Sequence, residues 1–169
     1  MEEVFHTIRA QGITFTSEQW GEYCKETRKD SSKLITTKIG KYVFNDFDIC
    51  LNPERDDIIV KDGSYGYKVS IKYADCGNGL WSFGLDYNVG TAGGGFGVSW
   101  VDKDTGDGCF RGYRTKVECL DAACERVEMC VMSCGGKNNK IALALIEKIK
   151  AYRKELKRPK IVQLELFEL

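Results

Sequence analysis

The chain is poor in proline and in histidine. It contains two prolines and one histidine among 169 residues. No segment approaches the roughly 18 uncharged apolar residues of a membrane-spanning helix, so we expect no membrane contact. The scarcity of proline and the hydrophobic content of 43% argue against a disordered chain. A Ser-His or Cys-His nucleophilic pair has only His6 as its base, and we therefore assign no catalytic residue.

Patterns for export and for metal binding are also lacking. Residues 1–6 are acidic and contain no apolar h-region, which argues against a secretory signal and leads us to expect a cytoplasmic protein. In a reducing compartment the eight cysteines are expected to be free, buried thiols. They include no C-x-x-C pair, the usual half of a structural zinc site. We therefore predict no metal and no cofactor.

Acidic and basic residues balance over the chain but not along it. There are 25 of each, and the net charge of zero argues against a general nucleic-acid binder. Residues 137–160, in contrast, are strongly basic, because only Glu147 and Glu155 oppose their lysines and arginines. The protein is expected to carry its positive charge on this segment.

The first part of the chain predicts two helices. Residues 1–12 are interpreted as a short helix that Gly12 closes as a left-handed C-cap. Thr16 and Gln19 match the capping-box pattern, which predicts that a second helix begins there. The polar run of residues 28–32 is expected to end it.

Residues 34–101 show the two-residue period of strands with one buried and one solvent-facing side. The pairs Asp62-Gly63 and Asn78-Gly79 and the glycine-rich run 90–95 are expected to form the turns. The expected strands are 34–38, 42–51, 58–61, 67–73, 81–87 and 96–100.

The helical period returns after residue 115. Thr115 and Glu118 form a second capping-box pattern, and Asn138 or Asn139 is expected to cap the last helix, which Pro159 ends. Together these helix and strand patterns predict an α+β fold. We expect a single antiparallel meander of about five strands, with the N-terminal and C-terminal helices packed on one face. We expect one domain over residues 1–158 and a tail peptide over residues 159–169.

Two loops resemble ligand-binding motifs but lack essential parts. Residues 102–108 are rich in aspartate, yet Gly106 occupies a ligand position of a calcium loop and no glutamate stands at the twelfth position. A hairpin turn between two strands is expected instead. The run Gly93 to Gly97 is followed by neither Lys-Ser/Thr nor a helix, so it does not predict a phosphate loop.

The last helix is the candidate contact with nucleic acid. Its apolar residues recur on one side, and its basic residues occupy the other. Such a face can follow the phosphates of a DNA backbone, or it can simply keep the helix solvated, and the sequence leaves both interpretations open. The candidate phosphate contacts are Lys150, Arg153, Lys154, Lys157 and Arg158.

The segment Gln163-Leu164-Glu165-Leu166-Phe167 resembles the pentapeptide by which bacterial replication and repair proteins dock on the sliding clamp, commonly written Q-L-S/D-L-F. Glu165 departs from the pattern, because serine or aspartate is usual there. The resemblance implies that the amide of Gln163 orients the peptide and that Leu166 and Phe167 fill an apolar pocket. The implied clamp-binding residues are Gln163, Leu164, Leu166 and Phe167.

The same segment also has the period of a strand. Val162, Leu164 and Leu166 alternate with Gln163 and Glu165, so these residues are equally suited to a strand on the protein's own sheet. The sequence does not choose between a free ligand peptide and a structural strand.

The rest of the chain resembles small accessory proteins of bacterial phages and plasmids, in which a strand of the type Gly84-Leu85-Asp86-Tyr87 precedes a capped helix. The resemblances together imply a non-enzymatic accessory protein of bacterial or mobile-element DNA metabolism, recruited by the sliding clamp and able to contact DNA. The alternative is a module that binds a small ligand or a protein and whose tail is a structural strand. An unrecognised enzyme is the third interpretation.

Overall fold

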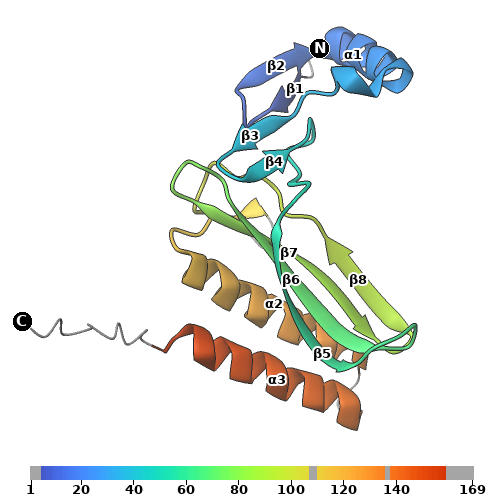
Figure 1. Cartoon of the computed structure of the whole chain (residues 1–169), viewed down its shortest axis with the longest axis vertical. Coiled ribbons are helices and arrows are strands. Elements are labelled where there is room, and N and C mark those ends of the chain that lie inside the picture. Colours follow the sequence, from blue (N-terminus) through green and yellow to red (C-terminus); the bar gives the residue numbers. More distant parts are fainter. Residues whose placement is uncertain (1–4, 107–109, 136–137, 159–169) are drawn as a thin grey trace, which may run out of the picture.

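The computed structural model describes residues 5–106, 110–135 and 138–158. Within these residues the chain forms three α-helices, a short 3-10 helix and eight strands arranged in three antiparallel sheets (Figure 1). The predicted α+β class and the antiparallel pairing are confirmed. The prediction of a single meander of about five strands is wrong, since two small hairpins precede a sheet of four strands.

The first hairpin replaces the helix predicted over residues 1–12. Strand β1 (Phe5–Ile8) pairs with β2 (Ile13–Thr16), and Gly12 has a φ of 68° in the turn between them. The carboxylate of Asp48 accepts hydrogen bonds from the backbone N–H of Arg9 and of Ala10, at 3.1 and 3.0 Å. A side chain almost forty positions away thus fixes this turn, which the local helical pattern could not indicate.

Helix α1 (Ser17–Lys29) begins as predicted, with the reciprocal hydrogen bonds of a Thr16–Gln19 capping box. It contains no fully buried residue. It contacts mainly β1, β2 and the 3-10 helix that follows it (Ser31–Lys33), at the N-terminal end of the molecule (Figure 1). The expectation that the N-terminal helix packs on the main sheet is therefore wrong.

The second hairpin connects this end to the main sheet. It consists of β3 (Thr37–Ile39) and β4 (Tyr42–Phe44), so the strand expected over 42–51 is much shorter than predicted. Tyr42 and Phe44 are buried in a small core, packed with Ala74 of the main sheet. The carboxylate of Glu54 accepts hydrogen bonds from Tyr42 and from Lys116, and these bonds tie the hairpin to the main body.

The main sheet is a meander in the order β5-β6-β7-β8. The expected turns at Asp62-Gly63 and Asn78-Gly79 separate its first three strands. The prediction failed at the fourth strand, because the run 90–95 is largely strand, and residues 97–100 form no named strand. The four strands are β5 (Glu54–Lys61), β6 (Tyr67–Asp75), β7 (Trp81–Val89) and β8 (Ala92–Phe96).

Helices α2 (Lys116–Gly135) and α3 (Lys140–Leu156) cover one face of this sheet (Figure 1). Helix α2 packs on β6, β7 and β8, and α3 packs on β5 and β6. The predicted caps are present: Glu118 exchanges hydrogen bonds with Thr115, and Asn139 accepts from the first backbone N–H groups of α3. The buried apolar residues of the four strands and the two helices form one continuous core, whose burial is the main stabilising term of the fold.

The segment between β8 and α2 is largely irregular. Asp104 forms an ion pair with Arg114 at 2.7 Å, and Tyr113 makes an isolated bridge to Trp81. In the described residues, β8 ends at Phe96 and the next named element is α2. The hairpin turn between two strands that was expected at residues 102–108 is therefore not confirmed. Residues 107–109 lie outside the described part. None of the described helices is long and apolar enough to cross a bilayer.

Candidate functional site

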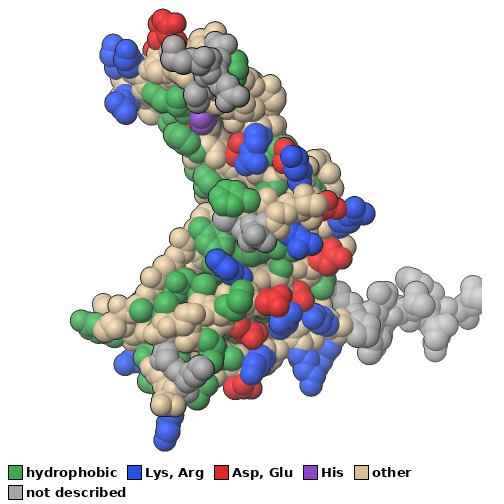
Figure 2. Space-filling view, turned by 180° about the vertical axis from the view of Figure 1, so that it is seen from behind, with side chains coloured by type: hydrophobic (Ala, Val, Ile, Leu, Met, Phe, Trp, Pro, Cys, Tyr) green, Lys and Arg blue, Asp and Glu red, His purple; other side chains and the backbone are tan. Residues whose placement is uncertain are grey.

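The basic face of α3 lies beside α2, and a shallow groove of about 410 Å³ separates their outer sides. Figure 2 shows Lys and Arg side chains interleaved with Asp and Glu on the lower body of the molecule. Three of the predicted phosphate contacts, Lys150, Lys154 and Lys157, line the groove together with Arg153. Glu128 of α2 lines it as well. The structure thus brings four of the five candidates together.

Arg153 is held by Asp121 of α2. It donates from Nε to one carboxylate oxygen and from Nη2 to the other, the latter at 3.0 Å. Lys157 reaches the same carboxylate at 2.9 Å. The hydrogen bonds from Arg153 lower the pKa of Asp121, and the same contact raises the pKa of the guanidinium. Arg153 therefore joins the two helices, a role that its position on the basic face did not reveal.

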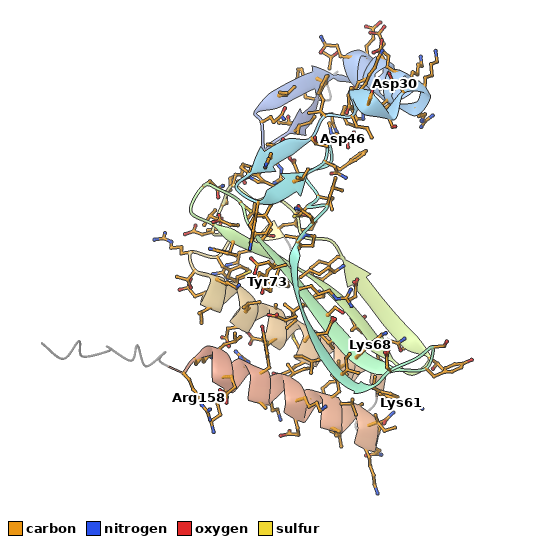
Figure 3. The ribbon with its side chains drawn as sticks, viewed as in Figure 1. Asp30, Asp46, Lys61, Lys68, Tyr73 and Arg158 are labelled. Atoms are coloured by element: carbon orange, nitrogen blue, oxygen red, sulfur yellow. The ribbon has the colours of Figure 1, made fainter. Side chains whose placement is uncertain are left out.

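The other basic residues are less firmly held. Lys150 pairs with Glu147 at 2.8 Å and Arg158 with Glu155 at 2.7 Å, and both pairs are exposed. Exposed pairs contribute about 0–1 kcal/mol, so these cations can exchange their partner for a phosphate at little cost. Lys154 is exposed and forms no ion pair with another described residue. Arg158 lies at the end of α3, away from the sheet (Figure 3).

The carboxylate of Glu128 makes this groove less favourable for a bound anion. Its Oε1 is buried and has no hydrogen-bond partner among the described atoms. A carboxylate next to a bound phosphate costs Coulomb energy, and no sequence pattern assigned this residue to the site. A nucleic-acid backbone would therefore follow the exposed cations and avoid the centre of the groove.

The implied clamp-binding residues Gln163, Leu164, Leu166 and Phe167 lie outside the described residues. Their interpretation as a free peptide or as a strand thus stays a prediction. The main core of the described part is made by β5 to β8, α2 and α3.

The described cysteines are free thiols, and several are buried. Burial raises the pKa of Cys76 to about 11 and that of Cys124 to about 12, and it also raises the pKa of Cys119. Raised values keep these groups as unreactive thiols at neutral pH. Cys134 is exposed, and Cys109 lies outside the described residues. Among the described residues, no group of three or more Cys, His, Asp or Glu side chains could hold a metal ion.

An aromatic cluster near the N-terminus was not anticipated. The ring of His6 stacks on Trp20 at a centroid distance of 3.4 Å, and Phe47 meets both rings edge-on. Phe15 and Tyr23 extend the cluster. Nε2 of His6 lies 3.4 Å from the backbone oxygen of Asp46, so its hydrogen bond within the described residues goes to backbone and not to a nucleophile. The cluster joins α1 to the turn before β5, a contact between distant segments that periodicity does not detect.

The face of the main sheet opposite the helices is polar. A depression of about 210 Å³ on it is lined by Arg55, Lys68, Ser70, Asp86 and Asn88, among others. Asp86 pairs with Lys72 at 2.7 Å, and Lys68 pairs with Asp62 at 2.8 Å. The alternation of polar residues along these strands predicted a solvated face of this kind.

No protein-family model, no curated protein and no solved structure matches the chain.

Proposed function

We propose that the protein is a non-enzymatic accessory factor of bacterial or mobile-element DNA metabolism, which acts in the cytoplasm and is recruited to DNA by the sliding clamp. The observation that carries the proposal is the segment Gln163 to Phe167, which matches the clamp-binding pattern at four positions.

The chemistry of the peptide suits such a partner. Short recognition peptides bind through a few buried apolar anchors, whose orientation is fixed by a small number of polar groups. Leu166 and Phe167 supply the anchors, and the amide of Gln163 supplies both a donor and an acceptor. Glu165 stands between them where serine or aspartate is usual, and it has the same negative charge as aspartate.

The end of α3 supplies a second contact, with the DNA that the clamp encircles. Lys150, Lys154 and Arg158 are exposed and shortly precede the clamp peptide in the sequence, and their ion pairs are absent or weak. Each contact alone is modest, but two contacts on one assembly add by effective concentration. Because phosphates are the same in every sequence, the DNA contact is expected to be independent of sequence.

The test is retention on clamp-loaded DNA. Nicked circular DNA carrying loaded bacterial clamps should retain the full chain, and the same DNA without clamps should retain it weakly, with a loss that steepens as salt increases. A variant with Leu166→Ala and Phe167→Ala should behave on loaded DNA as the unmodified chain behaves on bare DNA. Equal retention on loaded and bare DNA would contradict recruitment by the clamp.

A further inference from the structure

The two outer edges of the main sheet differ in how they are protected. A sheet edge exposes unpaired N–H and C=O groups, and proteins usually protect it with charged side chains, bulges or covering groups. Strand β5 has all three. Arg55, Asp57 and Lys61 are exposed on it, the register shifts between Ile59 and Lys61, and Lys148 of α3 donates to the carbonyl of Ile59 at 2.7 Å.

Strand β8 has none of these protections. Its sequence, Ala92 to Phe96, contains no charged residue and no proline, and its register with β7 is regular. Gly93, Gly94 and Gly95 are exposed, and no described strand pairs with their outer side. The backbone of this edge is thus open to another strand.

The close packing of β7 against β8 requires the glycines of β8. A Cβ at Gly95 would lie 2.3 Å from Oδ1 of Asp86, and one at Gly94 would lie 2.9 Å from the Tyr87 hydroxyl. Backbone atoms of β7 exclude a larger residue there, since a Cβ at Gly95 would also lie 2.5 Å from the backbone oxygen of Leu85, and one at Gly93 would lie 2.7 Å from that of Tyr87. The same lack of side chains leaves nothing on β8 that would obstruct an added strand.

The surroundings of β8 favour a strand with apolar residues on one side. Helix α2 contacts β8, and the hydroxyl of Tyr87 lies 4.0 Å from the thiol of the exposed Cys134. Ala92 and Phe96 are only partly buried on the side of the sheet that faces the helices. An added strand would cover these groups with every second side chain.

We propose that β8 is a strand-addition site and that its occupant is residues 161–169 of a second copy of this chain. This segment has the required pattern, because Val162, Leu164 and Leu166 alternate with polar Gln163 and Glu165. Addition of a strand to a sheet edge combines main-chain hydrogen bonds with pockets for alternate side chains.

The position of α3 favours a second copy over the same chain. Helix α3 packs on β5 and β6, whereas β8 lies at the opposite edge of the sheet, about three strand spacings or roughly 14 Å away. A segment that crossed this width would use about four of the eleven residues 159–169, Val162 included, before pairing began, at roughly 3.3 Å per extended residue. In a reciprocal exchange between two copies, each segment reaches the other copy's β8 and the assembly closes with two-fold symmetry.

The strand addition does not rest on the proposed function, whereas its regulatory consequence does. Leu164 and Leu166 would serve both partners, so a segment paired with β8 is withheld from the clamp. Self-association and clamp binding would be mutually exclusive, and each would weaken as the other partner's concentration rises.

The test uses the full chain and no clamp. Sedimentation velocity over a concentration series should show a reversible dimer, and hydrogen exchange should slow at the amides of residues 92–96 as dimer forms, with no change at 54–61. A synthetic peptide of residues 159–169 should compete and restore monomer. Leu164→Pro in the full chain should abolish the dimer, and Glu168→Gln should preserve it.

Peptide backbones provide the sharpest control. Only alternate residues of an added strand direct their N–H groups toward the edge. N-methylation at Leu164 and Leu166, or alternatively at Gln163 and Glu165, should therefore weaken competition about tenfold or more in one peptide and leave the other nearly unchanged. Equal effects would overturn the strand geometry.

The other results of the sedimentation and exchange experiments also test the proposal. A monomer at all concentrations with fast exchange at residues 92–96 would overturn the proposal. So would a dimer that Leu164→Pro leaves intact. Protection of 92–96 that is independent of concentration would replace the second copy by the chain's own segment. Because the experiment contains no clamp, none of these results depends on whether the clamp is bound.

Discussion

Arg153 of α3 and Asp121 of α2 form a two-pronged hydrogen-bonded pair that joins the two helices covering the main sheet. Their side chains are 28% and 24% exposed, so the pair is only partly screened by water. Lys157 adds a second cation to the same carboxylate. A residue that the sequence places among the candidate phosphate contacts is thus mainly part of the fold.

Replacing Arg153 by methionine should lower the free energy of unfolding by about 1–2 kcal/mol, because Asp121 keeps only its contact with Lys157. Lys154→Met, one residue along the helix and without an ion pair, should change it by less than about 0.5 kcal/mol. Urea denaturation of the two variants measures the difference. Equal losses would show that the pair does not join the helices.

Stability should fall in acid partly through Glu54. Its contacts with Lys41, Tyr42 and Lys116 outweigh its desolvation and lower its pKa to about 2. A lowered carboxyl pKa gives stability that is present above the unfolded value of about 4.3 and lost as pH falls toward 2. Between pH 5 and pH 2 the unmodified chain should therefore lose more unfolding free energy than Glu54→Gln, by on the order of 1–2 kcal/mol. Parallel pH profiles for the two proteins would contradict the assignment.

The thiols should differ in their rate of chemical modification according to their burial. A disulfide reagent should modify Cys134 of the native protein rapidly, whereas Cys76, Cys119 and Cys124 should react only after unfolding, since burial raises the pKa of each. Mass spectrometry after timed labelling distinguishes the sites. Elemental analysis should find no stoichiometric zinc, and one tightly held zinc per chain would show that the cysteines have a different role.

Binding of DNA should weaken steeply with salt and should not depend on sequence. Charge reversal at Lys150, Lys154 and Arg158 should abolish it, and this set leaves the Arg153–Asp121 contact intact. Glu128→Gln should strengthen binding severalfold, because it removes the carboxylate that lines the groove. Fluorescence anisotropy with a labelled duplex at several salt concentrations provides the measurement. Unchanged affinity in the triple variant would leave α3 as a solvated face.

Short sequence patterns predicted the helices and strands that are determined by interactions between residues close in sequence. The Thr16 and Thr115 caps and the alternation in β6 and β7 correspond to α1, α2 and two central strands. The β1–β2 hairpin was missed because its turn is held by Asp48 from outside the segment. Strand β8 was missed because glycine signals a turn by itself, whereas here it makes room for Asp86 and Tyr87.

The sequence predicted which basic residues share one face of α3 but not what each of them contacts. The helical period placed the lysines and arginines of α3 on one face, and the structure brings four of the five predicted residues to one groove. Which cations are held across the two helices depends on α2, whose distance and register no single helix encodes. Glu128 lines that groove and Asp121 binds Arg153 for the same reason, and neither residue carried a recognisable signal.

The central claim is tested most directly by the equilibrium affinity of the full chain for a bacterial sliding clamp, measured by calorimetry beside the double variant Leu166→Ala, Phe167→Ala. A short peptide that becomes ordered on binding is expected to bind in the micromolar range, at about −8 kcal/mol. Burial of each anchor contributes about 1.5–3 kcal/mol, so the variant should lose roughly 3–6 kcal/mol and show no detectable heat, with its melting temperature nearly unchanged. No binding by the intact chain, or a large drop in the melting temperature of the variant, would contradict the account.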